Sequence, residues 1–295
     1  MKKTVFNGCA TALVTPMNND GSVNYDVLKK IINNQIEGNI DALVICGTTG
    51  EGATLTNEEH IEVIKKSVEF ANGKVPIIAG TGSNDTKYAV ELSKEALDVG
   101  ANALLMVTPY YNKTSQHGLV VHYNYIAERI KAPIILYNVP SRTGVNIKPE
   151  TYKELSKIEN VVAVKEANGD IEAAKRTIEL CGDDLTIYTG NDDQIYEFCE
   201  IGGKGVISVI SNILPNETHD MVMEYLNGNK EKSKELTIKY HNLMKALFAD
   251  VNPVPIKEDM NLMNLNVGPC RLPLVPMLEE IKETLVKALK EQNLI

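Results

Sequence analysis

The feature that most constrains this chain is a repeated pair of patterns: a short apolar run ending in polar or glycine residues, then an amphipathic stretch of helical period. Eight such runs occur, at residues 8–16, 41–46, 75–79, 103–108, 133–138, 161–166, 185–189 and 205–210. Continuous apolar strands that alternate with helices indicate a parallel sheet covered on both faces. Eight units of this kind predict an α/β fold, a closed (β/α)₈ TIM barrel.

The stretches between the runs carry helix start signals. Residues 57–71 open with Asn57 as the expected cap, and residues 85–99 and 170–180 each open with an aspartate. The alternative, an open doubly wound sheet, usually carries a phosphate-binding glycine fingerprint. The nearest candidate, at residues 80–85, lacks the third glycine because position 85 is Asp. The barrel is therefore favoured.

After residue 211 the alternation of apolar runs and helical stretches stops. No further strand is predicted there, and the pattern predicts helices at residues 215–226, 230–248, 255–264 and 274–292. This last part is joined through Asn252 and Pro253. We expect residues 1–211 to hold the barrel strands and the catalytic site. Residues 212–295 should form the last barrel helix and a C-terminal helical extension.

Composition excludes several classes of protein. The net charge of −9 without a basic cluster argues against nucleic acid as a partner. No run approaches the ~18 apolar residues of a membrane span, and the N-terminus lacks the continuous apolar stretch of a signal peptide. The five cysteines and five histidines are scattered, without metal-ligand spacing. We expect a cytoplasmic protein with no membrane partner, no metal and no bound cofactor.

In such a barrel the active site lies at the carboxyl ends of the strands. In this chain the predicted ends hold mainly hydroxyl groups, glycines and one lysine; they are Thr15, residues 47–51, 108–111, 137–140, 165–166 and 189–192, and Ser208. Neither the paired acids of glycoside hydrolysis nor a three-ligand metal set is present among them. Hydroxyl groups around a single amine suggest imine chemistry.

Lys165 closes the apolar run Val-Val-Ala-Val. A lysine amine is nucleophilic only when neutral, and burial in apolar surroundings lowers the pKa of lysine, which is how Schiff-base lysines are activated. The alternative is a rim lysine that reaches solvent or pairs with a carboxylate such as Glu166.

The other strand-end residues also have two interpretations. Tyr137 and Tyr111 could simply cap the core, and Thr48 and Thr49 could be turn residues. Alternatively, hydroxyl and backbone N–H groups beside glycines can converge on a carboxylate. Arg142 is the best candidate for binding a substrate carboxylate, with an exposed loop arginine as the alternative.

Taken together, three separated motifs resemble the dihydrodipicolinate synthase/N-acetylneuraminate lyase family. They are Gly-Thr-Thr-Gly-Glu at 47–51, Tyr-Asn-Val-Pro-Ser-Arg-Thr-Gly at 137–144 and Val-Lys-Glu at 164–166. Pro-Tyr-Tyr-Asn-Lys at 109–113 and the turn at 79–82 add to the match, which spans essentially the whole chain. Within the family the chain is most similar to the synthase branch, which condenses pyruvate with L-aspartate-4-semialdehyde in lysine/diaminopimelate biosynthesis. Arg142 and the Thr48–Thr49 pair favour that branch over the sialic acid lyases.

The resemblance implies roles for these residues. Lys165 would form an imine with pyruvate, and Tyr137 would donate and accept protons through Thr48 and Tyr111. Thr49 would bind the pyruvate carboxylate. The remaining implied roles are for substrate binding: Arg142 on the carboxylate of the aldehyde substrate, and the backbone at Gly190 and Ile207 lining the site.

The resemblance also implies an assembly and an effector site. The counterpart of Tyr111 reaches in from a neighbouring subunit, which implies a homotetramer built as a dimer of dimers. Many relatives are inhibited by lysine at a site whose positions in this chain are Ala53, Asn57, His60, Asn84, Tyr88 and Tyr110, and His60, Asn84 and Tyr110 match it. Asn57 stands where a histidine is often found and Tyr88 where a glutamate is often found, so we expect weak or absent inhibition.

Two alternatives stay open. Another pyruvate-dependent class I aldolase, such as a sialic acid lyase, would keep Lys165 and Tyr137 but would give Arg142 no strong role. A non-catalytic barrel that binds small carboxylates would not need the full set of Lys165, Tyr137, Thr48 and Tyr111.

Overall fold

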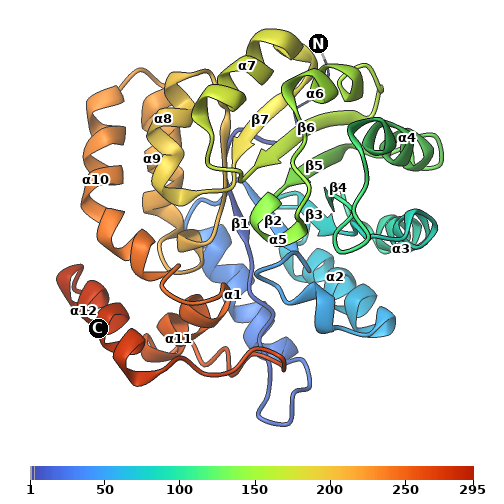
Figure 1. Cartoon of the computed structure of the whole chain (residues 1–295). Helices are drawn as coiled ribbons and strands as arrows, with labels where there is room; N and C mark the ends of the chain where they lie inside the picture. Colours follow the sequence, from blue (N-terminus) through green and yellow to red (C-terminus); the bar gives the residue numbers. More distant parts are fainter. Residues whose placement is uncertain (1, 3) are drawn as a thin grey trace.

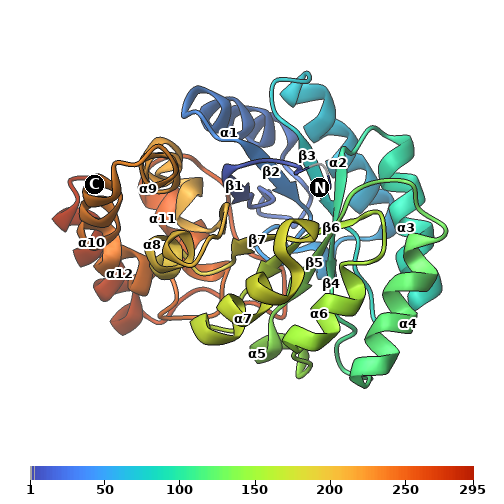
Figure 2. The ribbon, with the colours of Figure 1, turned by 90° about the horizontal axis from the view of Figure 1, so that it is seen from above.

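The structure is a computed structural model that describes residue 2 and residues 4–295. Its strands are β1 (Gly8–Ala12), β2 (Ala42–Ile45), β3 (Ile77–Gly80), β4 (Ala103–Val107), β5 (Ile134–Asn138), β6 (Val161–Glu166), β7 (Thr186–Thr189) and β8 (Gly205–Ser208). All are parallel and pair in sequence order, and β1 also pairs with β8, which closes the barrel (Figures 1 and 2). Each predicted apolar run overlaps one strand, so the (β/α)₈ prediction is confirmed.

Helices surround the barrel and continue beyond it (Figure 1). Those up to the last strand are α1 (Tyr25–Glu37), α2 (Asn57–Ala71), α3 (Thr86–Asp98), α4 (Gln116–Ala127), α5 (Pro140–Thr143), α6 (Pro149–Leu155), α7 (Ile171–Cys181) and α8 (Ile195–Glu200). After the last strand come α9 (Pro215–Leu226), α10 (Lys230–Ala246), α11 (Val254–Leu262) and α12 (Glu279–Glu291). Short 3₁₀ turns lie at η1 (Gly52–Thr54), η2 (Gly182–Asp184), η3 (Asp192–Gln194) and η4 (Ile210–Asn212).

The predicted caps are confirmed at Asp85 and Asp170, whose side chains accept backbone hydrogen bonds at the starts of α3 and α7. At α2 the prediction was wrong by one residue. Thr56 is the cap there, because it exchanges hydrogen bonds with Glu59 in a capping box. Asn57 is the first helical residue, which leaves its side chain free for other contacts.

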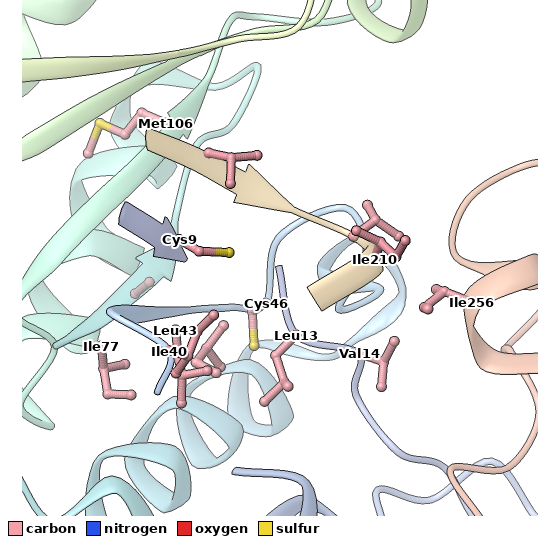
Figure 3. Close-up of a cluster of buried hydrophobic side chains, with 14 of the residues drawn as sticks. Cys9, Leu13, Val14, Ile40, Leu43, Cys46, Ile77, Met106, Ile210 and Ile256 are labelled. Atoms are coloured by element: carbon pink, nitrogen blue, oxygen red, sulfur yellow. The ribbon is translucent and has the colours of Figure 1, made fainter. Parts of the chain in front are cut away.

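Side chains alternate between the two faces of each strand and form two apolar clusters. The inner cluster fills the barrel and includes Ala42, Ile78, Ile135, Tyr188 and Ile207. The outer cluster lies between the strands and the helices and continues into the C-terminal extension. Figure 3 shows part of it, with Ile256 of α11 on the same side of the cluster as Val14 and Ile210.

The C-terminal extension lies along one side of the barrel, where α10, α11 and α12 group together in both views (Figures 1 and 2). Helix α12 begins only at Glu279, so the prediction that it starts at Leu274 was wrong. Pro276 explains the later start, because a proline disfavours helical geometry at the residue before it and cannot donate a hydrogen bond. The irregular segment before α12 runs back to the loop after β1, where the Met17 amide donates to the Val267 carbonyl at 2.9 Å.

Within the described residues, none of the helices has the length and apolar character needed to cross a membrane.

Candidate active site

Lys165 and Tyr137 lie side by side at the carboxyl end of the barrel. They are register partners on the neighbouring strands β6 and β5, and both point inward because residues two apart on a strand share a face. The Lys165 Nζ lies 4.5 Å from the centre of the Tyr137 ring. Lys165 is only 6% exposed. No carboxylate lies within 4.0 Å of its Nζ in the part of the chain that the structure describes.

Glu166 does not pair with Lys165, so that alternative is wrong. As the next residue of the strand it points to the outer face, where its carboxylate accepts hydrogen bonds from Asn138 Nδ2 at 2.9 and 3.0 Å and from the Tyr152 hydroxyl at 2.7 Å. Burial raises the pKa of Glu166 to about 7, against the opposing effect of these hydrogen bonds. The same contacts tie the ends of β5 and β6 together directly behind the Tyr137–Lys165 pair.

The next two strands close the space around the lysine. A Cβ at Gly190 would lie 3.0 Å from Lys165 Cε and 2.8 Å from Ala167 Cβ, so glycine lets this loop approach the amine. Ile207 is fully buried in the inner cluster.

Asp192, whose position at a strand end the sequence indicated without a role, is buried near the same site. Its Oδ2 accepts from the Val209 and Ile210 amides at 3.0 and 2.9 Å. Burial raises the pKa of Asp192, and its hydrogen bonds and the nearby Lys165 oppose that rise.

The loop after β2 presents the two threonines. Thr49 is 2% exposed, and its Oγ1 accepts a hydrogen bond from Asn252 Nδ2 at 3.0 Å. Arg142, an exposed residue on α5, donates from Nη2 to the Asn252 carbonyl at 3.0 Å. Asn252 thus joins two predicted site residues. The sequence marked Asn252 only as a junction between helices.

A cavity of about 490 Å³ brings the predicted catalytic and effector residues together. Its wall includes the catalytic candidates Thr48 and Tyr137, the substrate-binding candidate Arg142, and the effector candidates Ala53, His60, Tyr88 and Tyr110. Asn57 and Asn84 are not among the wall residues. Asn57 Oδ1 accepts from the Tyr88 hydroxyl at 3.0 Å, and the Asn84 carbonyl accepts from Asn112 Nδ2 at 3.0 Å.

Two further groups lie near the predicted effector residues, which we call the effector end of the cavity. Asn57 Nδ2 donates to Glu95 Oε2 at 2.8 Å, so a carboxylate that the sequence did not indicate lies close by. The His60 ring is hydrogen-bonded through Nε2 to the Gly80 carbonyl at 2.8 Å, and burial lowers the pKa of His60. His60 is therefore held as a neutral wall residue at neutral pH.

Tyr111 is the one predicted catalytic residue that the single chain leaves apart from the others. It is 91% exposed and adopts a left-handed conformation with φ of 69°. No hydrogen bond joins Tyr111, Thr48 and Tyr137 among residues 2 and 4–295. Non-glycine residues rarely adopt positive φ, and such strain is frequent at functional sites.

The described residues contain no group of three or more His, Cys, Asp or Glu side chains placed to hold a metal ion. The functional groups that the site offers for chemistry are an amine, hydroxyl groups and a guanidinium.

Comparison with known proteins gives matches along the full chain. A profile of the Dihydrodipicolinate synthetase family matches residues 5–292. A 4-hydroxy-tetrahydrodipicolinate synthase of Acetivibrio thermocellus is 53% identical over 295 residues, covering 100% of both chains. A dihydrodipicolinate synthase from Acinetobacter baumannii, solved in complex with pyruvate, has a TM-score of 0.97 and 42% identity, covering 99% of this chain and 100% of that one. The enzyme of Cyanidioschyzon merolae, solved with lysine bound, has a TM-score of 0.96 and 36% identity, with 99% and 100% covered.

The fold and the site define a (β/α)₈-barrel protein whose mouth holds a buried lysine among hydroxyl groups. The full-length matches then establish that the chain belongs to the Dihydrodipicolinate synthetase family. The resemblance drawn from the motifs is thereby confirmed, and the chain is a lyase-type enzyme of this family.

Proposed function

We propose that this enzyme is a 4-hydroxy-tetrahydrodipicolinate synthase that condenses pyruvate with L-aspartate-4-semialdehyde through an imine on Lys165. The observation that carries the proposal is the placement of Lys165, 6% exposed and beside Tyr137 at the carboxyl end of the barrel. A buried lysine amid apolar side chains is the usual setting of an imine-forming amine. The names of the relatives and the pyruvate held by the Acinetobacter baumannii enzyme support the same activity.

In the first step the Lys165 amine attacks the keto carbon of pyruvate, and the oxygen leaves as water to give the imine. Thr49 is suited to bind the pyruvate carboxylate. Because Thr49 Oγ1 already accepts from Asn252, its own O–H remains available as a donor. The backbone at Gly190 and Ile207 completes this end of the site.

In the second step the methyl carbon of the imine loses a proton, and the resulting enamine carbon bonds to the aldehyde carbon. The aldehyde oxygen then gains a proton, for which Tyr137 is the donor in reach of Lys165. Thr48 lines the same cavity as Tyr137, which supports a role for Thr48 in passing that proton on. Attack by the product's own amino group on the imine carbon would release Lys165.

Tyr111 completes the relay only if it comes from a second copy of the chain. Its 91% exposure and positive φ support a side chain presented outward to a neighbour. We propose a homotetramer, a dimer of dimers, in which Tyr111 crosses the tighter interface. Arg142 would bind the carboxylate of the aldehyde substrate, because it lines the cavity and a guanidinium can bind a carboxylate through two hydrogen bonds.

The test is incubation with pyruvate and borohydride, which reduces an imine to a stable amine, followed by peptide mass analysis. We expect one pyruvate adduct, on Lys165, and none in the Lys165→Met variant. An unmodified Lys165 at saturating pyruvate would contradict the proposal and would leave a non-catalytic carboxylate-binding barrel.

The second substrate is tested separately, by comparing turnover of aspartate semialdehyde with that of N-acetylmannosamine. We expect turnover with aspartate semialdehyde. Preference for N-acetylmannosamine would make the chain a sialic acid lyase.

A further inference from the structure

The loop that carries Thr48 and Thr49 is tightly folded. The Glu51 amide donates to the Thr48 carbonyl at 3.1 Å, and Glu51 itself has a φ of 54°. A Cβ at Gly52 would lie 2.2 Å from the Cys46 carbonyl oxygen. The two threonines therefore depend on a backbone conformation that needs support from outside the loop.

That support comes from α11 of the C-terminal extension. The Lys257 Nζ donates to Glu51 Oε1 at 2.8 Å, and the two side chains are 2% and 1% exposed. The same ammonium donates to the Thr15 carbonyl at 3.1 Å and to the Pro269 carbonyl at 2.6 Å. All three of its hydrogens are thus used. The other Glu51 oxygen accepts from the Arg271 amide at 2.8 Å.

Stability alone does not account for this arrangement. Taking two charges out of water is costly, and apolar residues of similar volume often replace such a pair without loss of stability. The neighbouring Ile256 lies in the outer apolar cluster (Figure 3). Apolar packing is therefore available at this place, and the ion pair adds fixed geometry.

The pair also lies where its geometry reaches the threonines. Thr15, whose carbonyl accepts from Lys257, donates from Oγ1 to the Gly50 carbonyl at 2.6 Å. Five residues before Lys257, Asn252 donates to Thr49. The extension therefore holds the loop at Thr49, at Gly50 through Thr15 and at Glu51.

We propose that Lys257 is a positioning residue, which fixes the Thr48–Thr49 loop through its buried ion pair with Glu51 in the conformation that binds the substrate carboxylate. The identity of that substrate rests on the proposed function. The claim that the ion pair fixes the conformation of the loop does not rest on the proposed function.

The test compares Lys257→Met with Lys282→Met. The control removes another ion pair of the extension, between Lys282 and Glu258 at 2.5 Å, without touching the loop. Hydrogen exchange read residue by residue should show that the Glu51 and Gly52 amides lose protection by tenfold or more in Lys257→Met, with the strand amides unchanged. Equal protection of these two amides in both variants would overturn the proposal.

A second readout separates positioning from general destabilisation. In an otherwise unmodified chain, Lys257→Met should raise the pyruvate concentration for half-maximal trapping on Lys165 by tenfold or more. In a Thr49→Val background the same change should raise it less than twofold, because coupled residues are not additive. If Lys257→Met still raised the pyruvate concentration for half-maximal trapping tenfold in the Thr49→Val background, the proposal would be contradicted. If Lys257→Met does not fold, Glu51→Gln, which keeps an oxygen for the Arg271 amide, takes its place in both measurements.

The outcomes also distinguish the two proposals. No adduct on Lys165 in the unmodified enzyme would defeat the proposed function, and amide exchange alone would then decide the role of Lys257. A normal adduct together with unchanged exchange and trapping in both Lys257→Met and Glu51→Gln would defeat only the positioning role.

Discussion

Tyr137 and Lys165 are register partners on neighbouring barrel strands, and the Lys165 amino nitrogen lies 4.5 Å from the centre of the Tyr137 ring. Behind them, on the outer face of the same strands, Asn138 donates to both carboxylate oxygens of Glu166. The strand pairing and this side-chain bridge fix the tyrosine and the lysine relative to each other before any substrate binds. Such preorganisation is what a two-step imine mechanism requires.

Tyr137→Phe tests the proton-transfer role without disturbing this packing. The phenylalanine ring keeps its place over Lys165, while the hydroxyl, which has no protein hydrogen-bond partner among the described residues, is lost. We expect kcat to fall about 10²–10⁴-fold, as for removal of a general acid–base group. Melting monitored by circular dichroism should be nearly unchanged. A kcat close to that of the unmodified enzyme would exclude Tyr137 as the proton donor.

The strand-end rule explains why so much of the site could be predicted from the sequence. Lys165, Tyr137 and Thr48 each follow or close an apolar run, and a closed parallel barrel brings the ends of its strands to one mouth. Periodicity is also strong enough to predict the strands and most of the helices. It failed at the start of α12, where Pro276 delays the helix, and at the α2 cap, where a capping box selects Thr56.

The contacts of the extension could not be predicted in the same way. Asn252 and Thr49 are 203 positions apart, and Lys257 and Glu51 are 206 apart. Neither a lysine on a predicted helix nor an asparagine between two predicted helices has a pattern that marks it as buried. Only the path of the chain back across the barrel mouth brings these side chains to the loop.

Arg142→Ala should separate the two substrates. A hydrogen bond between charged groups contributes about 1.5–3 kcal/mol, so the KM for aspartate semialdehyde should rise about 10–100-fold. Half-saturation by pyruvate, measured by borohydride trapping, should change little because Thr49 and Lys165 remain. Arg142→Lys keeps the charge but loses the forked donor geometry, so it should restore only part of the affinity. An equal effect on both substrates would argue for a structural role through Asn252 instead.

Asp259 gives a prediction about stability and pH. It is 0% exposed on α11, neither carboxylate oxygen has a hydrogen-bond partner among the described residues, and burial, with a smaller effect of Glu258, raises its pKa to about 8. Because the folded-state pKa lies above the unfolded value, the folded state binds the proton more tightly. The contribution of Asp259 to stability therefore falls as the pH rises from about 4 to about 8.

Asp259→Leu should remove this dependence. One pKa unit corresponds to about 1.4 kcal/mol, so the gain in unfolding free energy over the unmodified chain should be on the order of 3 kcal/mol larger at pH 8 than at pH 5. Urea denaturation at the two pH values measures the difference. A gain of the same size at both would show that Asp259 does not titrate between them.

The effector end of the cavity gives a prediction about regulation. Tyr88 donates to Asn57, and Asn57 in turn donates to Glu95, so the nearby carboxylate already has a hydrogen-bond partner. Tyr88 itself offers no carboxylate to a cationic amino acid that enters beside it, and the Glu95 carboxylate is held at Asn57. We therefore expect little inhibition by lysine in a steady-state assay at concentrations that inhibit lysine-sensitive relatives.

Tyr88→Glu should increase lysine affinity by about 10–100-fold, the equivalent of one charged hydrogen bond, while Tyr88→Gln should not. The Cyanidioschyzon merolae enzyme, solved with lysine bound, serves as the reference. Strong inhibition of the unmodified chain at low lysine concentration would show that Glu95 can leave Asn57 and pair with the ammonium.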